Sequence, residues 1–242
     1  MNLSRNWLNE FVDLHDITDK QFNDEMTLSG SKVETIERLD ESLKNVVAGK
    51  ILSMEKHPDS DHMWVCQLDV GREEPVQIVT GAWNIHVGDL VPAALHKSVL
   101  PGGVKIEKGK LRGVPSNGMM CSFQELGLSH GCVPYACENG ILFLPAGTPV
   151  GEDIKNVLGL DDWVSDFEIT SNRPDCLSVI GLARETAATF DRPFSVKTPE
   201  VKGVGDDINK YMSVEVKDTD LCPRYTARIV KNIKIEPSPA WM

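Results

Sequence analysis

The middle of the chain consists of short apolar runs that Gly and Pro interrupt at intervals of roughly ten residues. Between about residues 46 and 150 these runs are VVAGKILSMEKH, WVCQLDVG, VQIVTGA, DLVPAAL, GVKIEKGKLRGV and GILFLP. Short runs rich in β-branched residues are typical of antiparallel strands in a small closed or nearly closed barrel. Gly109 and Gly113 stand where tight turns or bulges would let such strands curl. This pattern predicts an all-β unit over residues 40–150.

Mixed helical and strand patterns lie on both sides of this β-rich stretch. Ser4 and Thr18 are typical N-caps, each followed by apolar residues at helical spacing, and residues 33–39 alternate like a strand. After the β-rich stretch, GEDIKNVLGLDD predicts a short helix, VSDFEIT a strand, and residues 176–190 a helix. Both flanks are therefore expected to be α+β in character.

The predicted fold class is α+β multidomain. A discontinuous α+β domain of residues 1–39 and 151–195 would contain the barrel of residues 40–150 as an insertion. A polar connection, SVKTPEVKGVGDD, then leads to MSVEVKD and YTARIVKNIKI, which predict the first strands of a third unit in residues 200–242. Because two strands cannot bury a core alone, we expect this third unit to be incomplete.

The charge distribution argues against a protein that binds nucleic acid unaided. The formal net charge is −11, and residues 40–150 carry nine Lys and Arg against twelve Asp and Glu. A protein that binds through phosphate neutralisation usually presents a basic face. The barrel offers only a local patch, in which Glu107 stands among four cations: Lys105, Lys108, Lys110 and Arg112. Any contact with RNA should therefore be weak or assisted by other parts of an assembly.

Other sequence features bear on the cellular compartment. No stretch approaches the roughly 20 uninterrupted apolar residues of a membrane span. The N-terminal MNLSRNWLNEFVDL lacks the basic and apolar regions of a signal peptide. The six cysteines are widely spread, which favours free thiols over a disulfide framework. We therefore expect a cytoplasmic protein with no membrane partner.

The stretch ITSNRPDCLSVIGLARETAA collects reactive residue types in few positions. Pro174 fixes its own φ and disfavours a helical Arg173, so Asn172, Arg173, Pro174 and Asp175 predict a break between a strand and a helix. Asp175 has the residue type of the N-cap of that helix. Gly181 weakens a helix interior, so we expect close packing to require it.

A catalytic interpretation of this stretch is the alternative, with Cys176 or Ser178 as nucleophile. A nucleophile needs a base within reach, and the nearest histidine in sequence, His130, lies far upstream. The pattern of breaker, cap and helix is complete without catalysis. We therefore predict a structural corner and no catalytic residue.

A metal site is considered at Cys121, His130, Cys132 and Cys137, which lie close together in sequence. Their spacing does not give the paired C-x₂-C motifs of structural zinc sites. Cys121 also lies in an apolar run, where a buried free thiol fits. We predict no metal here.

Several blocks resemble one known family. FEITSNRPDCLSVIGLARETAA, NLSRNWLNEFVDL, LSGSKVETIE and CPRYTARIVKNIKIEPSPAWM are similar to the N-terminal third of the β subunit of bacterial phenylalanine–tRNA ligase. The resemblance implies an enzyme that attaches phenylalanine to tRNA(Phe), using ATP and magnesium, as a cytoplasmic heterotetramer of two α and two β subunits. It places aminoacylation on the α subunit and editing in a third β-subunit domain, mostly beyond Met242.

This resemblance also implies what the present chain does. Residues 200–242 would be the first strands of that truncated, editing-type domain. The chain itself would be non-catalytic and hold no cofactor. Its expected work is scaffolding, contact with the α subunit and a share of tRNA binding, with no DNA partner.

The barrel carries a second resemblance. HPDSDHMWVCQLDVG, QIVTGAWNI and GKLRGVPSNGMMCS, in this order, resemble the tRNA-binding barrel of several synthetases and of free-standing tRNA-binding proteins, which implies a five-stranded OB-fold. OB barrels bind nucleic acid across a groove lined with cations and stacking residues. The tRNA-binding candidates are Asn84, Lys105, Lys108, Lys110, Arg112, Ser116 and Asn117.

Simpler interpretations stand beside these candidates. Surface lysines on a β-ribbon are often only solvated, and Ser116-Asn117-Gly118 is a sound turn without a ligand. The residue types of Asp59, Asp61 and His62 favour turn and capping roles. Two alternative functions are a free-standing OB-fold module that binds tRNA or acts like a chaperone, and a structural spacer without RNA affinity. The flanking blocks NWLNEFVDL and NRPDCLSV favour the synthetase, because a lone barrel needs neither.

Overall fold

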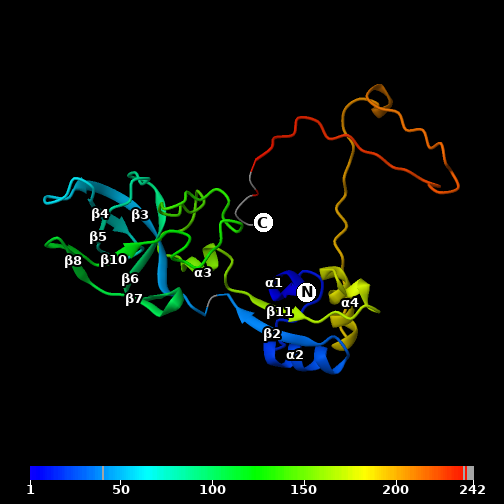
Figure 1. Ribbon diagram of the computed structural model, residues 1–242, viewed down its shortest axis with the longest axis horizontal. Helices are drawn as coiled ribbons and strands as arrows, with labels where there is room; N and C mark the ends of the chain where they lie inside the picture. The colour runs from blue at the N-terminus through cyan, green and yellow to red at the C-terminus, as the bar shows by residue number, and fades with distance from the viewer. Residues whose placement is uncertain (40, 237, 239–242) are drawn as a thin grey trace. The chain divides into compact units, whose positions relative to one another are not determined.

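The computed structural model describes residues 1–39, 41–236 and 238, which form two compact units. The first unit covers residues 1–195 and the second covers residues 196–236. Figure 1 shows the first unit as two groups of elements, a curled β-sheet and a smaller group of helices and strands.

The smaller group is built on a three-stranded antiparallel sheet in which β11 lies between β1 and β2. Helices α1, α2 and α4 accompany it (Figure 1). Its elements are β1 (Asn2–Ser4), α1 (Arg5–Asn9), α2 (Asp19–Leu28), β2 (Val33–Arg38), β11 (Trp163–Phe167), the 3₁₀ helix η2 (Pro174–Cys176) and α4 (Val179–Thr189). The first residues of the chain and residues 163–195 thus share one group of elements.

One apolar cluster joins these elements. Leu8 and Phe22 are fully buried in the same cluster as Phe167 and Leu182. The ring of Phe22 meets that of Phe167 edge-on, with centroids 6.3 Å apart. Burial of such side chains, worth roughly 1.5–3 kcal/mol each, ties the two sequence segments together.

The predicted caps of the first two helices are present. The Ser4 hydroxyl accepts a hydrogen bond from the Trp7 amide at 3.0 Å, and the Thr18 hydroxyl accepts one from Gln21 at 3.2 Å. The Asp162 carboxylate adds a second cap, because it accepts the Asn6 amide at 3.0 Å. The start of α1 is therefore held by a residue adjacent to β11.

The β-rich stretch forms the predicted curled antiparallel sheet, with strand order β10-β6-β3-β4-β5 and β7 paired to β6. Strands β8 and β9 form a separate two-stranded hairpin. The elements are β3 (Lys44–Lys56), β4 (Trp64–Asp69), β5 (Val76–Thr80), β6 (Leu90–Leu100), the 3₁₀ helix η1 (Pro101–Gly103), β7 (Val104–Ile106), β8 (Gly109–Leu111), β9 (Val114–Ser116) and β10 (Gly118–Met120).

The two ends of this sheet are hydrogen-bonded to each other. The Asn117 amide donates to the Gln77 carbonyl of β5 at 2.8 Å. The Ser116 hydroxyl accepts the Val79 amide at 3.0 Å and donates to the Gly118 carbonyl at 3.0 Å. The sheet is thereby nearly closed, as the sequence predicted.

The strand predicted for GILFLP, residues 140–145, does not form, and this prediction is wrong. Residues 140–142 and Leu144 are still buried, and the Leu142 and Leu144 amides donate to the carbonyls of Cys121 and Leu90. At Ile141 the side-chain amide of Asn84 takes the place of a ladder partner. Asn84 accepts the Ile141 amide and donates to the Ile141 carbonyl, both at 3.0 Å. The main chain of Ile141 is therefore satisfied without a regular ladder.

Helix α3 (Ile154–Val157) packs with the curled sheet. Asp153 caps it by accepting the Lys155 amide at 3.0 Å. Ile154 is fully buried in a cluster with Leu43 and Val46. Helix α3, which follows residue 150 in the chain, therefore buries its apolar side chain against residues of the β-rich stretch.

The second unit contains one short 3₁₀ helix, η3 (Ile208–Lys210), and its described residues include no strand. The strands predicted for MSVEVKD and YTARIVKNIKI are therefore absent within residues 196–236. A strand needs a hydrogen-bonded neighbour, and these segments have none in this unit. The ammonium of Lys231 lies 4.3 Å from the ring centroid of Tyr211.

None of the helices in the described residues has the length and apolar character that a bilayer crossing requires.

The Asn84 contact makes a first prediction. The change Asn84→Ala leaves the buried amide and carbonyl of Ile141 without partners, so we expect the free energy of unfolding to fall by about 2–3 kcal/mol. Urea denaturation measures this loss. The matched control is Asn117→Ala, because the Asn117 side chain makes no hydrogen bond within the described residues, and its effect should stay within about 0.5 kcal/mol. Equal losses for both variants would contradict the role given to Asn84.

Candidate nucleic-acid interface

The cationic hairpin, residues 109–116, carries three of the predicted RNA contacts: Lys110 on β8, Arg112 in the turn and Ser116 on β9. Lys110 is in register with Pro115, and Leu111 with Val114. The two turn residues between the strands, Arg112 and Gly113, have positive φ angles of 44° and 86°. Two successive residues of this conformation are typical of a type I′ turn, the usual connection of tight hairpins. Lys110 and Arg112 are both exposed.

Side chains from neighbouring segments hold this hairpin. The buried ring of His57 contacts the Leu111 carbonyl, with Nε2 3.0 Å from the oxygen. The guanidinium of Arg112 donates to the Asp59 carbonyl at 3.1 Å. The Gln77 side-chain amide donates to the Pro115 carbonyl at 2.7 Å. The turn at residues 57–61 therefore serves as a support for the hairpin.

The other two predicted cations lie near the cationic hairpin in sequence. Lys105 is exposed on β7, opposite Val99. Lys108 is also exposed, and its amide donates to Nδ1 of His96 at 3.2 Å. Within the described part of the chain, Lys105, Lys108, Lys110 and Arg112 form no ion pair with a carboxylate. Their charges are available to a ligand.

A hollow of about 470 Å³ brings Lys108 and Asn117 together. Its charged lining also contains Arg72 and two glutamates, Glu73 and Glu74. Carboxylates repel phosphate, so this hollow is a mixed site and not a purely cationic one.

Two predicted contacts lie inside the sheet. Asn84 and Ser116 are buried, with exposed fractions of 9% and 5%. The amide of Asn84 is fully engaged by Ile141, and the hydroxyl of Ser116 by Val79 and Gly118. Both side chains use their polar atoms within the protein, so either one could contact RNA only after breaking these hydrogen bonds.

At the predicted corner, Arg173 lies between two carboxylates. Its guanidinium donates to Asp175 at 2.9 and 3.2 Å and pairs with Glu185 of α4 at 2.5 Å. These hydrogen bonds hold the pKa of the Asp175 carboxyl below its usual value. Asn172 and Pro174 are exposed beside them. The charged side chains of the corner are thus paired with one another.

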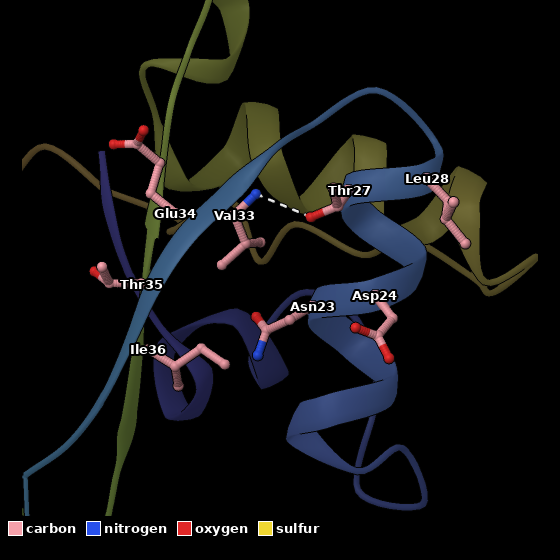
Figure 2. A pocket seen from close by; sticks show the side chains of 8 residues that line it. All are labelled: Asn23, Asp24, Thr27, Leu28, Val33, Glu34, Thr35 and Ile36. Atoms are coloured by element: carbon pink, nitrogen blue, oxygen red, sulfur yellow. Dashed lines mark hydrogen bonds between the residues drawn. The ribbon is translucent and has the colours of Figure 1, made fainter.

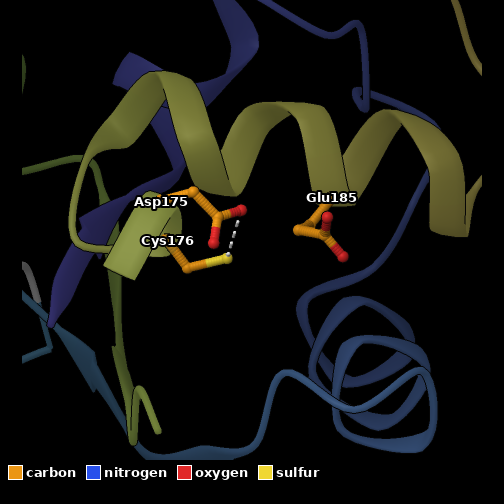
Figure 3. Close-up of side chains that lie close together, drawn as sticks. All are labelled: Asp175, Cys176 and Glu185. Atoms are coloured by element: carbon orange, nitrogen blue, oxygen red, sulfur yellow. Dashed lines mark hydrogen bonds between the residues drawn. The ribbon is translucent and has the colours of Figure 1, made fainter. Parts of the chain in front are cut away.

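Asp175, Cys176 and Glu185 form a group of possible metal ligands within the described residues (Figure 3). Arg173 already supplies these carboxylates with the positive charge that a metal ion would bring. The Cys176 thiol is buried and lies 3.6 Å from an Asp175 oxygen. Burial, the largest cause, raises the pKa of this thiol, which disfavours the thiolate that a nucleophile requires.

The N-cap of α4 is Ser178, so the prediction of Asp175 as N-cap is wrong. The Ser178 hydroxyl accepts the Gly181 amide at 3.0 Å and donates to the Asp175 carbonyl at 3.1 Å. The carboxylate of Asp175 is bound to Arg173 and leaves the cap to Ser178. Close packing at Gly181 is confirmed, because a Cβ there would lie 1.8 Å from the Asp175 carbonyl oxygen.

The four residues considered for zinc have other surroundings. Cys121 is buried in the apolar cluster of the curled sheet, which raises the pKa of its thiol to about 12. The ring of His130 contacts Phe123, with centroids 5.8 Å apart. Cys132 lies 3.3 Å from the Ser129 hydroxyl, and the Cys137 thiol donates to a backbone carbonyl. All six cysteines are free.

A second hollow, of about 600 Å³, lies between α2 and β2 (Figure 2). Its lining includes two carboxylates, Asp24 and Glu34, with apolar Leu28 and Ile36. The eight lining residues include no lysine or arginine. This chemistry does not suit a phosphate backbone, so the cationic hairpin is the better candidate for RNA contact.

Comparison with known proteins adds to this geometry. Residues 46–153 match the family described as "Putative tRNA binding domain". Over its whole length the chain is 55% identical to the phenylalanine–tRNA ligase beta subunit of Clostridium acetobutylicum and 50% identical to that of Clostridium tetani. The chain spans about 30% of the length of each of these curated relatives.

A solved structure, that of the MetRS related protein from Pyrococcus horikoshii, is 19% identical, with a TM-score of 0.31 over 44% of this chain and 85% of that one. The family match coincides with the curled antiparallel sheet, β3 to β10, which is consistent with an OB-like fold.

Gly181 generates a prediction about the corner. The change Gly181→Ala forces a methyl group into the Asp175 carbonyl, so we expect the free energy of unfolding to fall by about 2 kcal/mol despite the better helix propensity of alanine. Thermal and urea denaturation report the loss. Gly109→Ala is the control, because a Cβ at Gly109 meets no atom within 4 Å. A stabilised Gly181→Ala variant would refute the close contact.

The ion pair between Arg173 and Asp175 predicts that the free energy of unfolding depends on pH. The pKa of Asp175 is lowered in the folded state. The stabilisation of the fold by this ion pair is therefore present above the ordinary aspartate pKa of about 3.9 and is lost as the pH falls below it. The change Arg173→Gln should therefore lower the urea midpoint at pH 7 and make less difference near pH 3. Arg184→Gln is the control, since Arg184 stacks on Phe194. A pH-independent difference for Arg173→Gln would contradict this account.

Proposed function

We propose that this chain, which belongs to the phenylalanine–tRNA ligase β-subunit family by sequence over its whole length, contributes tRNA binding and subunit scaffolding to the charging of tRNA(Phe). One observation carries the proposal: the match to these β subunits spans all 242 residues and includes a tRNA-binding family match at residues 46–153. The whole enzyme would be an ATP-dependent ligase.

The proposed RNA contact lies on the cationic hairpin and its neighbours. Lys105, Lys108, Lys110 and Arg112 are exposed cations without carboxylate partners in the described residues. Cations of this kind attract the phosphate backbone without reading sequence. The overall acidity of the chain, with a net charge of −11, keeps the contact local and of modest affinity. Asn117 would add a polar contact from the adjoining hollow, and Asn84 and Ser116 would support the sheet beneath.

The proposed partners are those of a heterotetramer of two α and two β subunits in the cytoplasm. ATP and magnesium would be held outside this chain, and the chain itself would be non-catalytic. The corner supports this, because Arg173 neutralises the carboxylates of Asp175 and Glu185 and the Cys176 thiol is buried. Scaffolding and contact with the α subunit are the remaining roles.

The domain organisation is part of the same proposal. Residues 1–39 and 151–195 would form a discontinuous domain around the barrel of residues 40–150. Residues 200–242 would belong to a third, editing-type domain. Large apolar side chains are exposed in the second unit, such as Val204 at 95% and Leu221 at 86%. This exposure supports the proposal that further residues of the same domain would pack against them.

A free-standing OB-fold module is the alternative function. The identity to β subunits extends through residues outside the sheet, which a lone barrel would not need. A structural spacer without RNA affinity is the other alternative, and a tRNA titration separates it from the main proposal. Failure of the chain to co-purify with the matching α subunit would count against the scaffolding role.

The proposal predicts the effect of charge reversal. Lys110→Glu together with Arg112→Glu should lower affinity for tRNA(Phe) by about tenfold or more at low salt, and reduce the slope of log K against log[salt] by about 1–2. Filter binding or fluorescence anisotropy at two salt concentrations measures both quantities.

The control for this experiment is Lys20→Glu with Lys202→Glu, which makes the same change in net charge at residues that belong neither to the cationic hairpin nor to the curled sheet. It should leave the affinity within about twofold, because affinity depends mainly on the cations that meet the phosphates. Unmeasurable affinity of the unaltered chain would favour the spacer. Equal effects of both double variants would show that only net charge matters.

A further inference from the structure

The two hydrogen bonds of the His57 ring assign its tautomer. Its Nδ1 accepts the Asp59 amide at 3.0 Å, so the ring proton lies on Nε2. Nε2 then donates to the Leu111 carbonyl at 3.0 Å. The side chain is 4% exposed, so water does not compete freely for these bonds. One ring thus joins the turn at residues 57–61 to the cationic hairpin.

The cationic hairpin depends on such contacts for its orientation. Strands β8 and β9 pair with each other in a sheet of two strands. Isolated two-stranded hairpins are marginally stable in water. Neighbouring segments hold β9 through the Gln77 side chain and the Val79 amide, and they hold β8 through His57. The remaining contact is made by Arg112, one of the proposed RNA ligands itself.

We infer that His57 is a positioning residue that fixes the cationic hairpin in the orientation in which Lys110 and Arg112 meet tRNA phosphates. The inference rests on the proposed function. A hairpin fixed before binding loses less conformational freedom in the complex, and this raises affinity without a contact between His57 and RNA. His57 acts through the Leu111 carbonyl, which immediately precedes Arg112.

Two substitutions separate the two bonds of the ring. His57→Asn places an amide oxygen near the Nδ1 position, so it keeps an acceptor for Asp59 but does not reach Leu111. His57→Gln places its amide nitrogen near the Nε2 position, so it keeps a donor for Leu111. Both variants insert a polar amide at the same buried place, and their thermal stabilities are measured alongside.

Hydrogen exchange of the amides in residues 109–116 and binding of tRNA(Phe) are the two measurements. We expect His57→Asn to speed exchange in the cationic hairpin and to weaken tRNA binding, each by roughly fivefold, the factor that one net hydrogen bond provides. His57→Gln should stay within about twofold of the unaltered chain in both. If His57→Gln keeps both properties while His57→Asn loses them, the cause is the hydrogen bond to the Leu111 carbonyl and not a general loss of stability.

The outcomes separate this inference from the proposed function. Unchanged hairpin exchange in His57→Asn overturns the inference, and so do equal losses in the Asn and Gln variants that follow thermal stability. Faster exchange with unchanged tRNA binding overturns the positioning role if Lys110→Glu/Arg112→Glu weakens binding. If that double variant binds tRNA normally, the proposed RNA contact fails. Faster hydrogen exchange in His57→Asn than in His57→Gln would still show that the hydrogen bond to Leu111 stabilises the hairpin.

Discussion

The pairing of β11 with both β1 and β2 is the constraint on which the rest of the first unit depends. Ser165 lies in register with Leu3 on one side and Ile36 on the other. The ladder brings Leu39 next to Asp162, whose carbonyl accepts the Leu39 amide at 3.3 Å. The β-rich stretch therefore leaves and rejoins the three-stranded sheet at the same end of the paired strands β2 and β11. Such an arrangement lets a curled sheet be inserted without disturbing the apolar cluster around Phe22 and Phe167, because that cluster is completed by residues outside the insertion.

Within the curled sheet, polar side chains take over hydrogen bonds that a regular ladder would make. Asn84 binds both main-chain groups of Ile141, and Ser116 binds an amide and a carbonyl where β5 approaches the start of β10. His57 likewise makes hydrogen bonds to main-chain groups of the turn at residues 57–61 and of the cationic hairpin. In the cases of Asn84 and Ser116 a buried main-chain group would otherwise lack a partner, at a free-energy cost comparable to a lost hydrogen bond. These side chains make an irregular sheet possible, and so they bear on RNA binding through the shape of the surface.

Sequence reasoning predicted the features that local patterns determine. The N-caps Ser4 and Thr18, the strands of the curled sheet and the tight packing at Gly181 all follow from residue type and spacing. It could not predict features that depend on distant partners. The segment 140–145 has strand-like residues, but the main chain of Ile141 binds an amide side chain. Asp175 has a cap-like carboxylate that is bound by Arg173. The RNA candidates divide in the same way, because sequence alone does not show which polar atoms are already engaged within the fold.

That division, between polar groups that are engaged and those that are free, is also the physical basis for assigning function here. The corner contains an arginine, carboxylates and a thiol, the residue types of many active sites. Yet Arg173 is bound on both sides by carboxylates, and Cys176 is buried with a raised thiol pKa. Lys110 and Arg112, by contrast, lie on a hairpin whose main chain is held by other residues, so their charges remain open to solvent. An anionic ligand gains little from a cation that carboxylates already neutralise and more from a cation without a carboxylate partner. The proposed function therefore rests on the cationic hairpin and not on the corner, although the corner has the more reactive composition.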